Sequence, residues 1–228
     1  MQTAAALLSR RPHRPHPQIT LGSAEIALRL GRVHELCGSA RRTLALAVAA
    51  QTDTPVVWIT TVTTAETLCA DAIAERLEPG DMLFVKATKS DMALWAMEEA
   101  LRDGQAPVVI GELPAPPALV PVRRLHLAAE AGCNAGLCRP LALLLTPGQG
   151  GAPGIETRWS LEPAHHLGPD RWILDRLRAR MDPPRQWLMH PARTGLEPCA
   201  PRPEFSTKIL PQTGISSEIP QTPPGNDT

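Results

Sequence analysis

Residues 90–113, SDMALWAMEEALRDGQAPVVIGEL, constrain the fold of this chain more than any other segment. Apolar residues recur there at helical spacing, which predicts an amphipathic helix over residues 91–103 on the positions Leu94, Met97 and Leu101. Ser90 suits the N-cap of that helix, and Gly104 suits the left-handed position after its last turn. The bare apolar run 108–110 is typical of a parallel strand that is covered on both faces.

The same alternation of helix and strand patterns continues through most of the chain. The predicted elements are helix 43–51, strand 55–60, helix 64–77, strand 81–86, helix 91–103, strand 107–113, helix 122–131 with Gly132 as its stop, strand 135–139, and 141–146 as a strand of its own or a continuation of 135–139. This order indicates parallel β-α-β units with right-handed crossovers. We therefore expect an α/β fold with a mostly parallel sheet flanked by helices. Segments 155–162 and 171–180 are expected to add antiparallel edge strands, although 171–180 also fits a short helix.

Composition divides the chain into three parts. Residues 1–21 form a basic, proline-broken leader, residues 22–194 carry the α/β pattern, and residues 195–228 are rich in Pro, Thr, Ser and Gln. The last part has few large apolar residues to offset the entropy of ordering, so a disordered tail is expected.

Charge and residue usage exclude several classes of protein. The 228 residues hold 23 basic and 23 acidic side chains, no Tyr and two Phe, which disfavours a nucleic-acid surface built on charge and stacked aromatics. The apolar runs are too short to span a membrane, so a cytoplasmic protein with reduced cysteines is expected. Cys133 and Cys138 have a C-x4-C spacing, but a second Cys/His pair is missing, and no metal site is predicted.

Residues 38–43 have the layout of a shortened phosphate-binding loop. Gly38 precedes Thr43 by five positions, whereas the G-x-x-x-x-G-K-[ST] motif needs seven, and the second Gly and the Lys are missing. Fewer backbone N–H groups are then available to wrap a phosphate. Arg42 offers charge as a planar fork and not as the point charge of a Lys. A plain strand-turn-helix connection is the favoured interpretation, and a weak anion site is the alternative.

Glu112 stands at the carboxyl end of the predicted strand 107–113, where α/β folds hold their ligands. In P-loop ATPases an acidic residue at this place helps to bind magnesium. No carboxylate occurs at 60–65, after the preceding strand, and Glu66 is expected to form a capping box with Thr63 instead. We therefore expect neither catalysis nor a cofactor, and interpret Glu112 as a solvated strand end or a structural hydrogen-bond acceptor.

Several segments together resemble the ImuA family of bacterial damage-inducible mutagenesis proteins, which are related to RecA and to the division inhibitor SulA. They are GRVHEL (31–36), the helix 91–102, VVIGEL (108–113), RRLHLAAEA (123–131), GLCRP (136–140), TRW (157–159) and RW-x-L-x-x-LR-x-R (171–180). The resemblance implies a RecA-like core and a part in SOS-induced translesion synthesis. It implies three partners: a Y-family-like polymerase homologue, an error-prone replicative polymerase subunit and RecA. No catalytic residue is carried over with it.

Three functions remain open at this point. The favoured one is a non-catalytic adaptor of error-prone translesion synthesis, with weak or indirect contact to DNA. The second is a SulA-like inhibitor of the tubulin-like division protein, because VVIGEL and GLCRP also fit SulA relatives. The third, an active RecA-type ATPase, is disfavoured by the missing Lys and carboxylate. The length of the chain and the extended region after Gly154 favour the adaptor.

Overall fold

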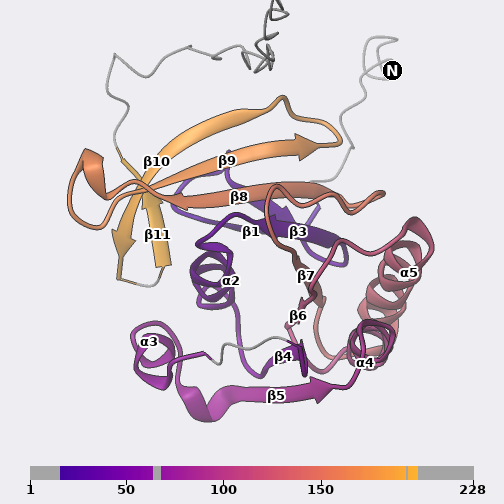
Figure 1. The fold of residues 1–228 in the computed structure, drawn as a ribbon. Helices are drawn as coiled ribbons and strands as arrows, with labels where there is room; N and C mark the ends of the chain where they lie inside the picture. Colours follow the sequence, from indigo (N-terminus) through magenta and orange to yellow (C-terminus); the bar gives the residue numbers. More distant parts are fainter. Residues whose placement is uncertain (1–15, 64–67, 194, 200–228) are drawn as a thin grey trace, which may run out of the picture.

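The apolar runs of the sequence form the inner strands of one large sheet in the computed structural model, which describes residues 16–63, 68–193 and 195–199 (Figure 1). The strands of this sheet are β3 (Val33–Cys37), β4 (Val56–Thr61), β5 (Met82–Ala87), β6 (Val108–Glu112), β7 (Leu141–Leu145), β8 (Thr157–Pro163), β9 (Trp172–Ala179), β10 (Arg185–Ala192) and β11 (Gly195–Pro198). A separate hairpin pairs β1 (Gln18–Thr20) with β2 (Ala27–Arg29). The helices are α2 (Arg41–Ala49), α3 (Ala70–Ala74), α4 (Ser90–Asp103) and α5 (Leu119–Ala135), with single 3-10 turns η1 (Pro79–Asp81) and η2 (His165–Leu167).

The nine strands lie in the order β11-β10-β9-β8-β3-β7-β6-β4-β5. All neighbours from β8 to β5 are parallel, and β9, β10 and β11 continue the sheet with antiparallel pairing. The predicted mixed α/β fold with a mostly parallel sheet is confirmed. Segments 155–162 and 171–180 were predicted to be antiparallel edge strands, and this placement is wrong, because β10 and β11 extend the sheet beyond them: β8 pairs in parallel with β3, and β9 lies between β8 and β10. Segment 171–180 forms a strand and not a helix.

Two apolar cores cover the two faces of the sheet. On one face α2 and the β1–β2 hairpin pack with Trp58 and Trp159, and on the other α4 and α5 pack with Val109 and Leu144. Every residue of β3, β6 and β7 is buried, as expected for parallel strands between two helical layers. Figure 1 shows α2 and the pair α4–α5 on opposite sides of these strands.

The antiparallel strands of the sheet are held together by an arginine that the sequence patterns did not single out. The Arg176 guanidinium lies 5.6 Å from the Trp159 ring centre and 5.3 Å from that of Trp187. It also donates to the Pro183 and Glu25 carbonyls at 3.1 and 3.0 Å. Since a desolvated cation over an indole face is stabilised, this stack joins β8, β9 and β10.

Close helix packing overturns two predictions around Gly132. Helix α5 continues through Gly132 to Ala135, because the glycine lies against α4: a Cβ there would stand 2.0 Å from the Leu101 carbonyl oxygen. The glycine is therefore required for contact between two backbones and does not end the helix. The predicted strand 135–139 is wrong as a consequence, since its residues end α5 and lead into β7.

The ends of several predicted elements also differ. Ser90 is the first residue of α4 and Lys89 is its N-cap, whereas Gly104 has the predicted left-handed conformation with φ 66°. The helix predicted over 64–77 is described only as α3, and the Thr63–Glu66 capping box falls partly outside the described residues.

Both predicted terminal segments contain ordered strands. β1 lies within the expected leader 1–21 with Ile19 buried, and β11 lies within the expected tail 195–228 with Leu196 buried. The folded part therefore extends beyond the predicted limits of 22–194 at both ends. None of the helices in the described part of the chain is long and apolar enough to cross a membrane.

Candidate functional site

The turn between β3 and α2 is the best candidate site, and β8 lies against it. Gly38 has φ +85°, a left-handed conformation that favours glycine. A Cβ at this position would lie 2.5 Å from the Leu161 carbonyl oxygen and 2.8 Å from the Ser160 hydroxyl. Glycine is thus required both by the turn and by the close approach of β8.

The first N–H groups of this turn all have acceptors within the chain. Ser39 donates its backbone N–H to Glu162 Oε1 at 3.1 Å, and its hydroxyl donates to Glu162 Oε2. Ala40 N–H donates to the Leu161 carbonyl at 3.0 Å, and Arg41 N–H to the Gly38 carbonyl at 3.4 Å. Helix N-termini bind anions through such groups. Here the Glu162 carboxylate takes the place that a bound anion would occupy.

Glu112 is held by two arginines from the first turn of α2. Arg42 Nε lies 2.9 Å from Glu112 Oε1 and 3.0 Å from Oε2, and Arg41 Nη2 lies 3.3 Å from Oε1. The carboxylate is only 3% exposed, whereas Arg41 and Arg42 are 25% and 20% exposed. Both carboxylate oxygens therefore already accept charge-assisted hydrogen bonds from within the protein.

The structure brings three of the four residues singled out from the sequence into one place. Gly38, Arg42 and Glu112 meet at the carboxyl ends of β3 and β6. Thr43 is half-buried in the first turn of α2, and no hydrogen bond of its hydroxyl is recorded within the described ranges. The interpretation of Glu112 as a solvated strand end is wrong, because it is buried; its role as a structural acceptor is confirmed.

Ser39, Arg41 and Glu162 were missed by sequence reasoning. Glu162 belongs to β8, which follows Ser39 by more than a hundred residues, so no local motif links the two. Arg41 was missed because adjacent helical residues normally point in different directions, so Arg41 and Arg42 were not expected to contact the same carboxylate. The one available signal was the Arg41-Arg42 pair at a helix start, where carboxylates are favoured and cations are not.

A second buried carboxylate, Glu35 on β3, places β8 beside the turn. It accepts from Thr146 Oγ1 at 2.7 Å, from Gly151 N–H at 2.9 Å, from Ala152 N–H at 3.1 Å and from Arg158 Nε at 2.5 Å. Since a buried charge is tolerated only when paired and hydrogen-bonded, these donors are required together. Glu35 thereby fixes the loop before β8 and the first part of β8 itself.

His34 on β3 makes a second connection to β8. Trp159 Nε1–H donates to Thr157 Oγ1 at 2.7 Å, and the Thr157 hydroxyl lies 2.6 Å from His34 Nδ1. His34 Nε2 lies 3.0 Å from the Arg29 carbonyl, which can only accept. This network assigns the proton to Nε2 and makes Nδ1 the acceptor of the Thr157 hydroxyl. Burial lowers the pKa of His34 to about 4, so the ring is neutral.

Cys37 and His126, near these elements, each contact a backbone carbonyl. Burial raises the pKa of Cys37 to about 11, and its Sγ donates to the Trp159 carbonyl at 3.3 Å. The Nε2 atom of His126 lies 3.1 Å from the Gly154 carbonyl. No group of His, Cys, Asp or Glu able to hold a metal ion occurs among the described residues.

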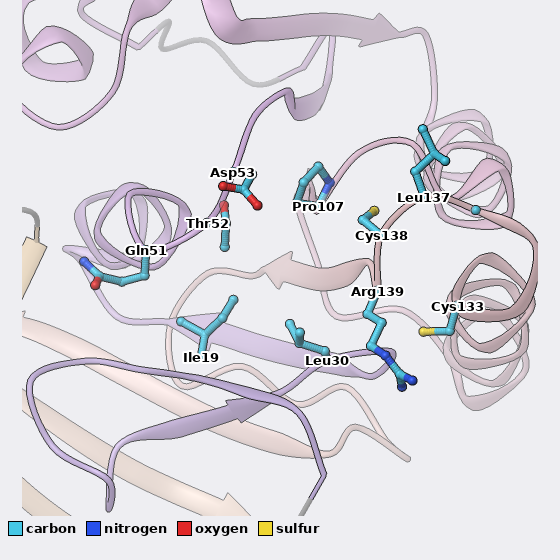
Figure 2. A pocket seen from close by; sticks show the side chains of 11 residues that line it. Ile19, Leu30, Gln51, Thr52, Asp53, Pro107, Cys133, Leu137, Cys138 and Arg139 are labelled. Atoms are coloured by element: carbon cyan, nitrogen blue, oxygen red, sulfur yellow. The ribbon is translucent and has the colours of Figure 1, made fainter.

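A cavity of about 510 Å³ lies at the opposite ends of the strands. Its walls include Leu30, Asp53, Pro107 and Arg139, which precede β3, β4, β6 and β7. Figure 2 shows Thr52 and Asp53 on one side and Cys138 and Arg139 on the other. Open α/β sheets bind ligands at the carboxyl ends of their strands. The residues that line this cavity precede the strands, so the cavity lies at the amino ends. It is therefore separate from the cluster around Glu112, which lies at the carboxyl ends.

No protein-family model matches the sequence, and no curated protein shows significant similarity to it. The resemblance to the ImuA family therefore stays a prediction.

The Glu112 cluster predicts a stability effect of charge removal. Glu112→Gln keeps the size of the side chain but removes the carboxylate charge that Arg41 and Arg42 both contact. We expect a loss of about 2 kcal/mol in the free energy of unfolding, below the value for fully buried pairs because both arginines are partly exposed. Urea unfolding measures it. Glu99→Gln, which breaks an exposed pair with Arg102, is the matched control and should lose much less stability, because solvent screens exposed pairs. Equal losses in the two variants would contradict a structural role for Glu112.

The buried neutral His34 predicts acid sensitivity. Its folded-state pKa of about 4 lies below the ordinary value of 6.5, so the unfolded chain binds the extra proton first as the pH falls. The stability contribution is complete above pH 6.5 and is lost as the pH falls toward 4, with a slope of up to about 1.4 kcal/mol per pH unit. Unfolding measured across this range should show the fall in the wild type and in the exposed-site control His166→Gln. His34→Gln should have a flatter profile; an unchanged profile in this variant would contradict the assignment.

Proposed function

We propose that this chain is a non-catalytic, RecA-like adaptor of SOS-induced, error-prone translesion DNA synthesis. The observation that carries the non-catalytic part is the internal use of the α2 N-terminus. The N–H groups of Ser39 and Ala40 donate to β8, through Glu162 and the Leu161 carbonyl. A nucleotide phosphate would have to displace a carboxylate of the same charge sign from this place.

The hydrogen bonds that Glu112 accepts from Arg41 and Arg42 support the same proposal. An acidic residue that binds magnesium needs a free oxygen directed toward the metal. Both oxygens of Glu112 face Arg42, and Oε1 also contacts Arg41. Two positive groups at this distance oppose the approach of a divalent cation. An adaptor that needs neither nucleotide nor magnesium is consistent with this arrangement.

The proposed partners come from the family resemblance. They are a Y-family-like polymerase homologue, an error-prone replicative polymerase subunit and RecA. The balance of 23 basic and 23 acidic residues supports binding to proteins over strong direct binding to DNA. The mostly parallel sheet flanked by helices is compatible with the RecA-like core that the resemblance implies.

The SulA-like alternative is favoured by one specific observation. The VVIGEL segment, which contains β6, and the GLCRP segment, which leads into β7, fit both groups of proteins. These segments supply the core and the turn before it, so they report the fold more than the partner. A cellular experiment is needed to distinguish the translesion adaptor from the SulA-like inhibitor.

Deleting the gene should lower the frequency of damage-induced mutation, and overproducing the protein should not by itself cause filamentous cells. The measurement compares mutation frequency and cell length after DNA damage, with capture of bound proteins from the same cells and identification by mass spectrometry. The translesion partners are expected in the captured fraction.

Filaments that persist in a strain without error-prone polymerases, together with direct inhibition of division-protein assembly in vitro, would instead support the SulA-like function. An unchanged mutation frequency would contradict the adaptor.

A further inference from the structure

The cavity at the amino ends of the strands has charges of opposite sign on its two walls. Asp53 follows α2 on one side, and Arg139 precedes β7 on the other (Figure 2). Both side chains are exposed, and within residues 16–63, 68–193 and 195–199 no ion pair or side-chain hydrogen bond is recorded for either. Each charge is therefore available to a group that a ligand brings in.

The wall that contains Asp53 is negative over more than one group. α2 ends at Ala49, and Gln51, Thr52 and Asp53, which follow it, line the cavity. The last turn of α2 has no basic residue to offset the partial negative charge of a helix C-terminus. Asp53 adds a full charge of the same sign. This wall is therefore suited to a cationic group of a ligand and disfavours a phosphate.

The wall that contains Arg139 keeps its positive charge. Cys133 and Cys138 line the cavity together with this arginine. Burial raises the pKa of both thiols, so they stay neutral near pH 7 and do not neutralise the guanidinium. A guanidinium binds a carboxylate through two parallel N–H groups. This wall is therefore suited to a carboxylate of a ligand.

Much of the remaining lining is apolar. It includes Ile19, Leu30, Pro107 and Leu137. Leu137 is 89% exposed, so an apolar group bound against it would remove its surface from water. The cavity volume of about 510 Å³ lies within the range of small-molecule sites, about 300 to 1,000 Å³. The ligand that matches these walls carries an amino group, a carboxylate and an apolar body.

The separation of the two charges decides which ligand of this kind fits. In a free amino acid the amino and carboxylate groups share one carbon, so they cannot reach opposite walls. In a linear peptide they stand at the two ends. A round cavity of this volume is about 10 Å across, and two or three extended residues span about that distance.

We propose that this cavity binds apolar peptides of two or three residues, with the amino group of the peptide at Asp53 and its carboxylate at Arg139. This binding site goes beyond the proposed function and does not depend on it, because it lies at the opposite ends of the strands from the Glu112 cluster.

Titration of the isotope-labelled full-length chain with the dipeptide Leu-Leu, followed by NMR, tests the site. The backbone amide signals of Asp53, Leu137 and Arg139 should shift and reach saturation, with a dissociation constant of about 0.1 to 10 mM. Free leucine should bind at least about threefold more weakly, because it can satisfy only one of the two walls at a time.

Blocking one end of the peptide at a time separates the two contacts. Acetyl-Leu-Leu lacks the amino charge and Leu-Leu amide lacks the carboxylate, so each should bind the wild type about three- to tenfold more weakly than Leu-Leu. In Asp53→Asn, acetyl-Leu-Leu should bind as Leu-Leu does, while the amide should still bind more weakly. Arg139→Gln should show the converse. The exposed controls Asp71→Asn on α3 and Arg178→Gln on β9 should keep the preferences of the wild type.

The amide spectrum of each variant shows directly that it is folded. Amide signals that do not saturate, shifts confined to other parts of the chain, or equal binding of leucine and Leu-Leu would each overturn the proposal. Equal binding of blocked and unblocked peptides to the wild type, or wild-type preferences retained in Asp53→Asn and Arg139→Gln, would overturn it as well.

Discussion

The buried carboxylate of Glu35 is the interaction on which the rest of this structure depends. It lies on β3, the middle strand of the sheet, and is fully buried with four hydrogen-bond donors around it. A carboxylate in such a place is stable only if all of its donors are in position. Two of those donors are backbone groups of the loop before β8, and one is Arg158 within β8.

The position of β8, which Glu35 fixes, determines the contacts of the turn at the start of α2. With β8 held parallel to β3, Leu161 and Glu162 come to lie against Gly38, Ser39 and Ala40. The N–H groups of Ser39 and Ala40 therefore already have acceptors within the chain, although Ser39 itself is exposed. On the other side of the turn Arg41 and Arg42 both pair with Glu112, which belongs to β6, two places away from β3 in the sheet. One buried group on β3 thus links the fold to the chemistry that this site supports.

Elements whose structure depends on neighbouring residues could be predicted from the sequence. Elements that depend on contacts with distant parts of the chain could not. Neighbouring residues alone show the apolar runs of buried strands and the spacing of helices. This is why the sequence predicted the strands at 108–110 and 141–146 and the helix 91–103. The length of α5 was not, because Gly132 is explained only by the α4 backbone opposite it. The strands β1 and β11 were missed because each is too short for a periodic pattern and is stabilised by its partner strand. In the candidate site, Gly38, Arg42 and Glu112 could be found from a known motif, whereas Glu162 could not, since its contact with Ser39 is set by strand order.

The central claim is that the internal carboxylates leave no place for a nucleotide at this turn. Its most direct test is calorimetric titration of the wild-type chain with ATP and magnesium, followed by measurement of ATP turnover with and without single-stranded DNA. The account predicts no saturable heat of binding and no turnover above background in either condition. Saturable ATP binding with DNA-stimulated turnover that is lost in Glu112→Gln, measured where this variant is still folded, would contradict it.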